Sequence, residues 1–310
     1  MSLIESVAPS EPEAAPDEPL VIGPRKATSR GGLVWRRLRA KPRFWFGIVV
    51  FGLLVLWAVF GPLLSPYTAT SRDPLNMGMG PTQLHWFGTD AIGEDIYAQT
   101  MSGLQKSLII GLVAGPLSTI IAAVVGSTAG YLGGAADKVI TWLIDLLLVL
   151  PAFFLLVLVS PIFTRYSWVA LTVFLAAFSW MIIAQVVRSQ TRSLKERDFV
   201  KAARFMGMRT PAVLMKHIIP NIASLLIIDA TLGVAASILA ETSLSYFGFG
   251  IRAPDVSLGT LLADGTGAAL TRSWLFVFPA GVLIVLLFSI SLVGDAFRDA
   301  VDPTSGVNRA

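Results

Sequence analysis

Long apolar runs separated by polar segments dominate the sequence. Six of these runs are long enough to cross about 30 Å of hydrocarbon, which takes roughly 20 helical residues. They are Phe44–Leu64, Leu108–Leu132, Val139–Ser160, Ser167–Val187, Ile222–Phe247 and Trp274–Gly294. In lipid, a helix satisfies the hydrogen-bonding groups of its backbone within its own segment. The pattern therefore predicts an all-α membrane protein with six transmembrane helices.

Composition supports this prediction and excludes several kinds of site. The chain is 54% hydrophobic and 14% charged, with a mean hydropathy of +0.70, whereas soluble domains carry about 25% charged residues. It has no cysteine, which excludes disulfides, thiolate metal sites and cysteine nucleophiles. His85 and His217 are predicted on opposite sides of the membrane, and no GxxxxGKS/T phosphate loop occurs. We expect no catalysis, metal or cofactor in this chain.

The positive charges predict the orientation. Most of the 24 Lys and Arg residues lie within 1–43 and 188–221, and positively charged loops stay in the cytoplasm. Both termini are therefore predicted to be cytoplasmic. The basic residues left outside are Arg72, Lys106, Arg165, Arg252 and Arg272. The basic run before Phe44 borders the membrane, so lipid head groups explain it better than nucleic acid does.

This topology divides the chain into segments. They are a cytoplasmic N-terminal tail (1–43), disordered to about residue 32 and then basic, a first transmembrane helix (44–64), an external loop (65–107), a five-helix core (108–294) with the cytoplasmic loop 188–221, and a cytoplasmic C-terminal tail (295–310). The outer segments 65–107 and 248–273 carry interfacial aromatics such as Trp86 and Trp274. They are either solvated loops with membrane anchors or a docking face for an external partner.

The cytoplasmic loop 188–221 predicts a helix, a glycine turn and a second helix. Asp198 is expected to cap the first helix, and Gly207 to end it because glycine tolerates positive φ. Thr210, which precedes a proline, is expected to cap the second helix, which Pro220 ends before the next span. The loop is thus expected to have structure of its own.

The first of these helices combines small and large apolar side chains. Ala202 and Ala203 allow close approach, while Phe199, Phe205 and Met206 could fill a groove on a partner protein. Alternatively, an amphipathic helix of this kind lies on the membrane with its basic face toward anionic lipid. The physical pattern leaves both interpretations open.

The string KAARFMGMRTPAVLMKHIIPN resembles the "EAA" loop of the membrane subunits of ATP-binding-cassette (ABC) importers. The matching positions are Ala202, Ala203, Gly207, Ile218 and Pro220. Lys201 stands where the family usually has Glu, so no ionic contact of that Glu can be carried over. The resemblance implies a coupling helix that docks on a cytoplasmic ATPase. The residues assigned to this ATPase-coupling loop are Phe199, Lys201, Ala202, Ala203, Arg204, Phe205, Gly207 and Met208.

Further strings resemble the C-type permease subunit of the dipeptide, oligopeptide and nickel ABC importers. In chain order, the matching strings contain WFGTDAIGEDIY, GSTAGYLGG, DLLLVLP, AETSLSYFGFGIRAPD and LVGDAFRDAVDP. The resemblance implies a type I ABC importer transmembrane domain in a prokaryotic cell membrane. Its expected partners are a second permease subunit in a heterodimer, two cytoplasmic ABC ATPase domains that use ATP and Mg, an external solute-binding protein and membrane lipid. Peptides are the favoured substrate, with a nickel complex as the alternative.

Acidic residues within the spans are candidates for the translocation pathway. A charge there costs about 2.5–3.5 kcal/mol on insertion scales unless it faces protein or water. Asp229 and Glu241 are assigned to the pathway, with a polar contact between helices as the alternative for Asp229. Asp145 is assigned to packing or capping. An ion-driven secondary transporter would show internal repeats, and none is evident. A structural or assembly role is a third possibility.

Overall fold

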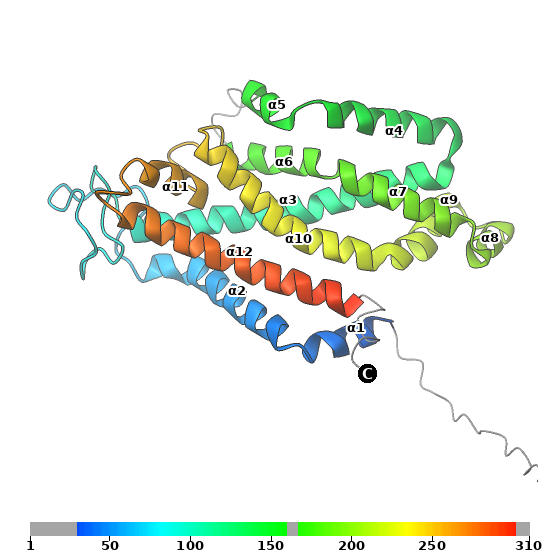
Figure 1. Cartoon of the computed structure of the whole chain (residues 1–310), viewed down its shortest axis with the longest axis horizontal. Coiled ribbons are helices and arrows are strands. Elements are labelled where there is room, and N and C mark those ends of the chain that lie inside the picture. Colours follow the sequence, from blue (N-terminus) through cyan, green and yellow to red (C-terminus); the bar gives the residue numbers. More distant parts are fainter. Residues whose placement is uncertain (1–29, 160–166, 302–310) are drawn as a thin grey trace, which may run out of the picture.

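The computed structural model describes residues 30–159 and 167–301, and the named secondary-structure elements in these ranges are all helices (Figure 1). The helices are α1 (Arg30–Arg39), α2 (Pro42–Phe60), α3 (Ile96–Leu132), α4 (Gly134–Val149), α5 (Ala152–Val159), α6 (Ser167–Ser179), α7 (Met181–Lys195), α8 (Asp198–Phe205), α9 (Thr210–Val213), α10 (Ile219–Tyr246), α11 (Leu258–Thr266) and α12 (Trp274–Val301). The predicted all-α class is confirmed. Most of the tail predicted to be disordered, and residues 302–310 of the C-terminal tail, lie outside the described residues.

Five helical runs among the described residues are long and apolar enough to cross a membrane. They are Pro42–Leu63, Ile96–Leu132, Trp168–Lys195, Thr210–Tyr246 and Trp274–Val301. The remaining predicted span is divided into α4 and α5. Leu150, between them, has an extended backbone at φ −74°, ψ 122°, because the residue before a proline avoids the helical conformation. Within the described residues, neither piece alone reaches the length of a span.

Figure 1 shows the bundle with its loops at two opposite ends. The segment between α2 and α3 lies at one end together with α11, and α1, α8 and the end of α12 lie at the other. Helix α1 was not predicted from the sequence. Its Leu38 packs with Phe44 of α2 and with Ala296 and Ala300 of α12. Both described ends of the chain therefore lie at the same end of the bundle, as the predicted topology requires.

Helix α3 forms the centre of the bundle, with α6, α7 and α10 packed against it. Its glycines face the neighbouring helices at backbone distance. A Cβ at Gly115 would lie 2.6 Å from the carbonyl carbon of Gly233 on α10, and one at Gly126 would lie 2.4 Å from the carbonyl oxygen of Ala184 on α7. The small residues at four-residue spacing therefore act in helix packing, as such residues do in membranes.

The external loop predicted as 65–107 ends earlier than expected, because α3 begins at Ile96. The carboxylate of Asp95 accepts a hydrogen bond from the backbone N–H of Ala98 at 2.8 Å and so caps the helix. The other oxygen of Asp95 lies 2.7 Å from Nδ1 of the buried His85. Nε2 of His85 lies 3.4 Å from a carboxylate oxygen of Asp73. This loop is thus folded onto the start of α3.

Hydrogen bonds also set the acidity of Asp73 in this loop. The side chain of Asn76 and the backbone N–H of Leu75 donate to its carboxylate and lower its pKa, with a smaller effect from His85.

The same loop also contacts α12, where the indole of Trp274 donates to the carbonyl of Thr89 at 3.2 Å. The loop is therefore tied to the first turn of α12.

Candidate functional site

The predicted coupling helix is α8, which lies at the end of the bundle beside α7 and α9 (Figure 1). Val200 and Ala203 are buried on one face. Val200 belongs to a cluster with Tyr131, at the end of α3, and with Val213 of α9. Val200 and Ala203 thus seat α8 on the bundle.

Large apolar side chains occupy the outer face of this unit. Phe205 is 91% exposed, Met206 79% and Phe199 43%. Ala202 and Arg204 are also exposed, and Met208 is half-buried beside the Tyr131 cluster. Exposed aromatic and methionine side chains on a short, seated helix are typical of a surface that another protein covers.

The end of α8 has the geometry that the sequence predicts. Gly207 has φ +78°. Its backbone N–H donates to the carbonyl of Arg204 at 2.9 Å, and that of Met208 donates to the carbonyl of Ala203 at 3.1 Å. These two bonds form a Schellman motif, which needs a left-handed residue at the position of Gly207.

The start of α8 differs from the prediction. Asp198 is the first helical residue, and Arg197 occupies the capping position without a side-chain hydrogen bond. A carboxylate in the first turn still stabilises a helix through the helix dipole. Likewise, Thr210 is the first residue of α9 and does not cap it, since Arg209 precedes the helix at φ −66°, ψ 146°.

The prediction that Pro220 ends the second helix is wrong. Helix α9 continues through a π-helical turn, Leu214–Ile218, directly into α10. Pro220 lies in the first turn of α10, directly after the π-helical turn, and a proline is tolerated at such a position because an N–H there would lack an α-helical partner. The helical run Thr210–Tyr246 therefore connects the predicted coupling loop to a membrane span without a break.

Lys201, which departs from the Glu usual in similar loops, pairs within its own chain. Its ammonium lies 3.2 Å from a carboxylate oxygen of Glu196. Both side chains are largely exposed, and such surface pairs contribute about 0–1 kcal/mol. The departure thus leaves the apolar surface of α8 intact.

The two acidic residues assigned to the pathway from the sequence lie in different surroundings. Glu241 is fully buried and accepts hydrogen bonds from Ser245 at 2.7 Å and from Ser107 of α3 at 3.3 Å. The Ser107 hydroxyl also accepts from the backbone N–H of Leu258 at 3.4 Å. This network joins α3, α10 and α11, which favours a packing role. A pathway role for Glu241 stays a prediction.

Asp229 is half-buried between α10 and α3. The hydroxyl of Thr119 donates to its carboxylate at 2.6 Å. Asp229 therefore has the helix–helix contact that was its alternative interpretation, and it also retains partial exposure.

The third acidic residue, Asp145, accepts a hydrogen bond from Gln185 of α7 at 3.0 Å and so links α4 to α7.

Replacing Asp229 by Asn tests its assignment to the pathway. The substitution keeps the contact with Thr119 and removes the charge. If Asp229 meets the amino terminus of a peptide, the KM for uptake of that peptide is expected to rise about tenfold in the Asn variant. This is the effect of losing a charge-assisted hydrogen bond. Uptake of an N-acetylated peptide serves as the control and is expected not to change. Unchanged uptake of the free peptide across pH would remove the pathway role.

Sequence reasoning missed two features of this site. Tyr131 lies under α8 with the ammonium of Lys195 5.7 Å and the guanidinium of Arg204 6.0 Å from its ring centroid. Arg188 of α7 forms a bidentate ion pair with Asp137 of α4. In each contact the partners lie on different helices, so no spacing in the sequence could have indicated these contacts.

Comparisons with known proteins extend the sequence resemblance. Residues 122–306 match the family described as "Binding-protein-dependent transport system inner membrane component". Residues 29–81 match the "N-terminal TM domain of oligopeptide transport permease C".

Among the described residues, no group of three or more His, Asp or Glu side chains could hold a metal ion.

Individual relatives match nearly the whole chain. The oligopeptide transport system permease protein OppC of Mycobacterium tuberculosis (strain ATCC 25618 / H37Rv) is 46% identical over 278 residues, which is 89% of this chain and 96% of that protein. OppC of Bacillus subtilis (strain 168) is 33% identical over 267 residues, with 86% and 87% covered. The dipeptide transport system permease protein DppC of the same organism is 32% identical over 307 residues, with 95% of each chain covered.

Proposed function

Because the chain belongs to the C-type permease subunits of the peptide ABC importers, we propose that it forms half of a translocation pathway for di- and oligopeptides and couples this pathway to cytoplasmic ATPases. It is a non-catalytic, multi-pass subunit in the cytoplasmic membrane of a bacterium. The relatives are named for oligopeptide or dipeptide transport, which favours peptides over a nickel complex. The family also argues against an ion-driven carrier.

The exposed surface of α8 is the observation that best supports the coupling role. Phe205 and Met206 project from a helix whose opposite face is buried in the bundle. The helix is followed by the unbroken run Thr210–Tyr246. A displacement of α8 by an ATPase that closes on ATP and Mg would therefore act directly on a membrane span. In this way the spans would alternate between inward-open and outward-open states.

The remaining partners follow from the same assignment. A second permease subunit would complete the pathway as a heterodimer, with two ABC ATPase domains on the cytoplasmic side. A solute-binding protein would dock on the outside, where Leu75 is 92% exposed and Leu270 is fully exposed. Both leucines lie in the loops at the end of the bundle opposite α8 (Figure 1).

A Phe205→Ala substitution tests the docking of α8. Loss of a large aromatic anchor from an interface costs about 2 kcal/mol or more, so the ATPases are expected to be retained at least tenfold less. The measurement is the amount of ATPase recovered with the tagged chain in mild detergent. Phe288→Ala, which removes a 55% exposed phenylalanine from α12, is the matched control. Equal recovery from the two variants would contradict docking through Phe205.

The substrate is tested by uptake in cells that lack this chain. Labelled tripeptide uptake is expected to depend on the restored wild-type chain, and nickel uptake is not. Nickel uptake restored without peptide uptake would overturn the peptide assignment and leave the permease assignment intact.

A further inference from the structure

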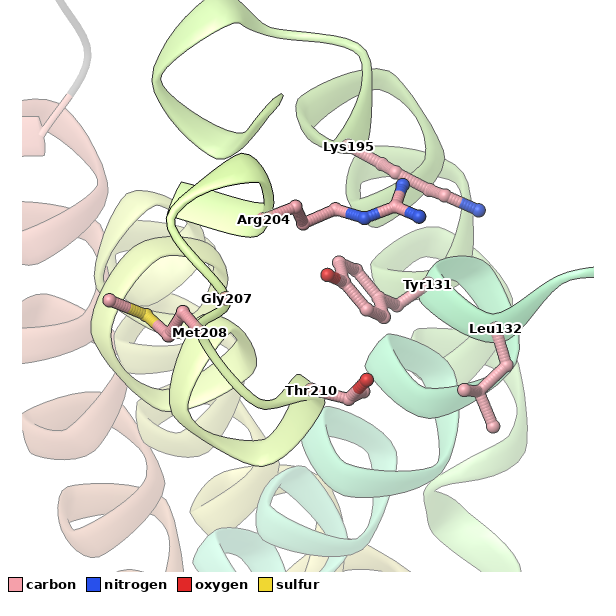
Figure 2. Close-up of a pocket in the computed structure, with 7 residues that line it drawn as sticks. All are labelled: Tyr131, Leu132, Lys195, Arg204, Gly207, Met208 and Thr210. Carbon is pink, nitrogen blue, oxygen red and sulfur yellow. The ribbon is translucent and has the colours of Figure 1, made fainter. Parts of the chain in front are cut away.

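A pocket of about 310 Å³ lies between the coupling helix and the ends of α3 and α7. It is lined by the side chains of Tyr131, Lys195, Arg204 and Thr210, among others. In Figure 2, Arg204 and Lys195 lie on one side of the Tyr131 ring, and Thr210 lies on the other. The pocket thus has two cationic groups on one side of the Tyr131 ring and the hydroxyl of Thr210 on the other.

The lining of this pocket is basic. No acidic residue lines the pocket, and within the described ranges neither Lys195 nor Arg204 forms an ion pair. Other basic residues nearby do so, Lys201 with Glu196 and Arg188 with Asp137. Two like charges gathered at one aromatic ring repel each other, and an anion between them would relieve that repulsion. Arginine, lysine and hydroxyl groups together suit a phosphate.

The position of the pocket brings it close to lipid. Tyr131 and Leu132 end α3, and Lys195 ends α7, both of which are membrane-spanning runs. Leu132 lines the pocket and is 50% exposed. A basic pocket at the cytoplasmic ends of transmembrane helices is a typical site for acidic lipid head groups. Free phosphate presents the same chemistry to the same side chains.

We propose that this pocket binds a phosphate group, either of an acidic phospholipid or of free phosphate, and thereby holds α8 on the bundle. Arg204 belongs to α8, Lys195 to α7 and Tyr131 to α3. A phosphate held between the two cations links α8, the helix that moves in the proposed coupling, to the end of α7. The site goes beyond the transport assignment, because it makes the coupling helix responsive to the membrane or to phosphate.

The test uses the chain purified with its partner subunits. Native mass spectrometry measures how much phosphatidylglycerol and phosphatidylcholine it retains at equal concentrations, and equilibrium dialysis measures binding of inorganic phosphate without added lipid. The pocket variant is Lys195→Gln with Arg204→Gln. The control variant is Arg197→Gln with Arg209→Gln, which removes two exposed charges of the same loop that do not line the pocket.

The wild type is expected to retain phosphatidylglycerol about tenfold more than phosphatidylcholine, since each nearby cation attracts acidic lipid. This preference is lost in the pocket variant and kept in the control. Binding of inorganic phosphate that is lost only in the pocket variant would also support the site, with free phosphate as its ligand. Identical lipid and phosphate binding by the wild type and both variants would overturn the proposal. So would pocket substitutions that change only the retention of the ATPases, because the occupant would then be a protein group. Neither readout depends on transport, so failure here leaves the importer assignment untouched.

Discussion

A Gly207→Pro variant is expected to lose ATP-driven peptide uptake while the chain remains in the membrane. Proline fixes φ near −65°, whereas Gly207 has φ +78°. Proline also lacks the N–H that Gly207 donates to the carbonyl of Arg204. The Schellman turn therefore cannot form, and α8 must leave its seat on Tyr131. We expect uptake and peptide-stimulated ATP hydrolysis to fall at least tenfold, measured per amount of chain in the membrane.

The matched control for this variant is Gly207→Asn. Asparagine adopts the left-handed conformation more readily than other residues with a Cβ, and a Cβ at Gly207 would meet no atom within 4 Å. Most of the uptake is therefore expected to remain in the Asn variant. Wild-type coupling in the Pro variant would contradict a role for the turn after α8.

A Gly115→Leu variant is expected to prevent the bundle from assembling. The added Cβ would lie 2.6 Å from the backbone carbon of Gly233 and the backbone nitrogen of Val234. Helices α3 and α10 would have to separate, and overpacking of this kind costs about 3 kcal/mol or more when backbone must move. We expect little folded chain in the membrane, measured by detergent-extracted, monodisperse protein.

Gly281→Leu is the control for the size of the new side chain. Gly281 lies on α12, is exposed, and has open space around its Cβ position. This variant is expected to accumulate like the wild type. Equal yields from the Gly115 and Gly281 variants would contradict the close crossing of α3 and α10.

The sequence predicts the spans well because hydropathy depends on composition alone. It predicts their ends less well, since these depend on particular backbone contacts. Helix α3 begins at Ile96 because Asp95 caps it, in a segment that is too polar to read as a span. Pro220 is compatible with a continuous helix only because a π-helical turn precedes α10. The division between α4 and α5 was not predicted, although Pro151 and the residue before it account for it.

The local structure of the proposed coupling site is predictable only in part. Gly207 is recognisable because only a few residues tolerate its backbone conformation. The exposure of Phe205 and the burial of Val200 are set by how α8 packs on α3, α7 and α9, so the sequence leaves open which face is free. Tyr131 is far from the loop along the chain and lies in no motif, and only the fold brings it beneath α8.

The central claim is that this chain is the membrane half of an ATP-driven peptide importer, coupled through α8. Affinity purification of the chain from its native membrane in mild detergent tests it most directly, with the bound proteins identified and ATP hydrolysis assayed. We predict recovery of a second permease, ABC ATPases and a peptide-binding protein, with hydrolysis stimulated by peptide. Recovery of the chain alone, under conditions that keep other membrane complexes intact, would contradict the account.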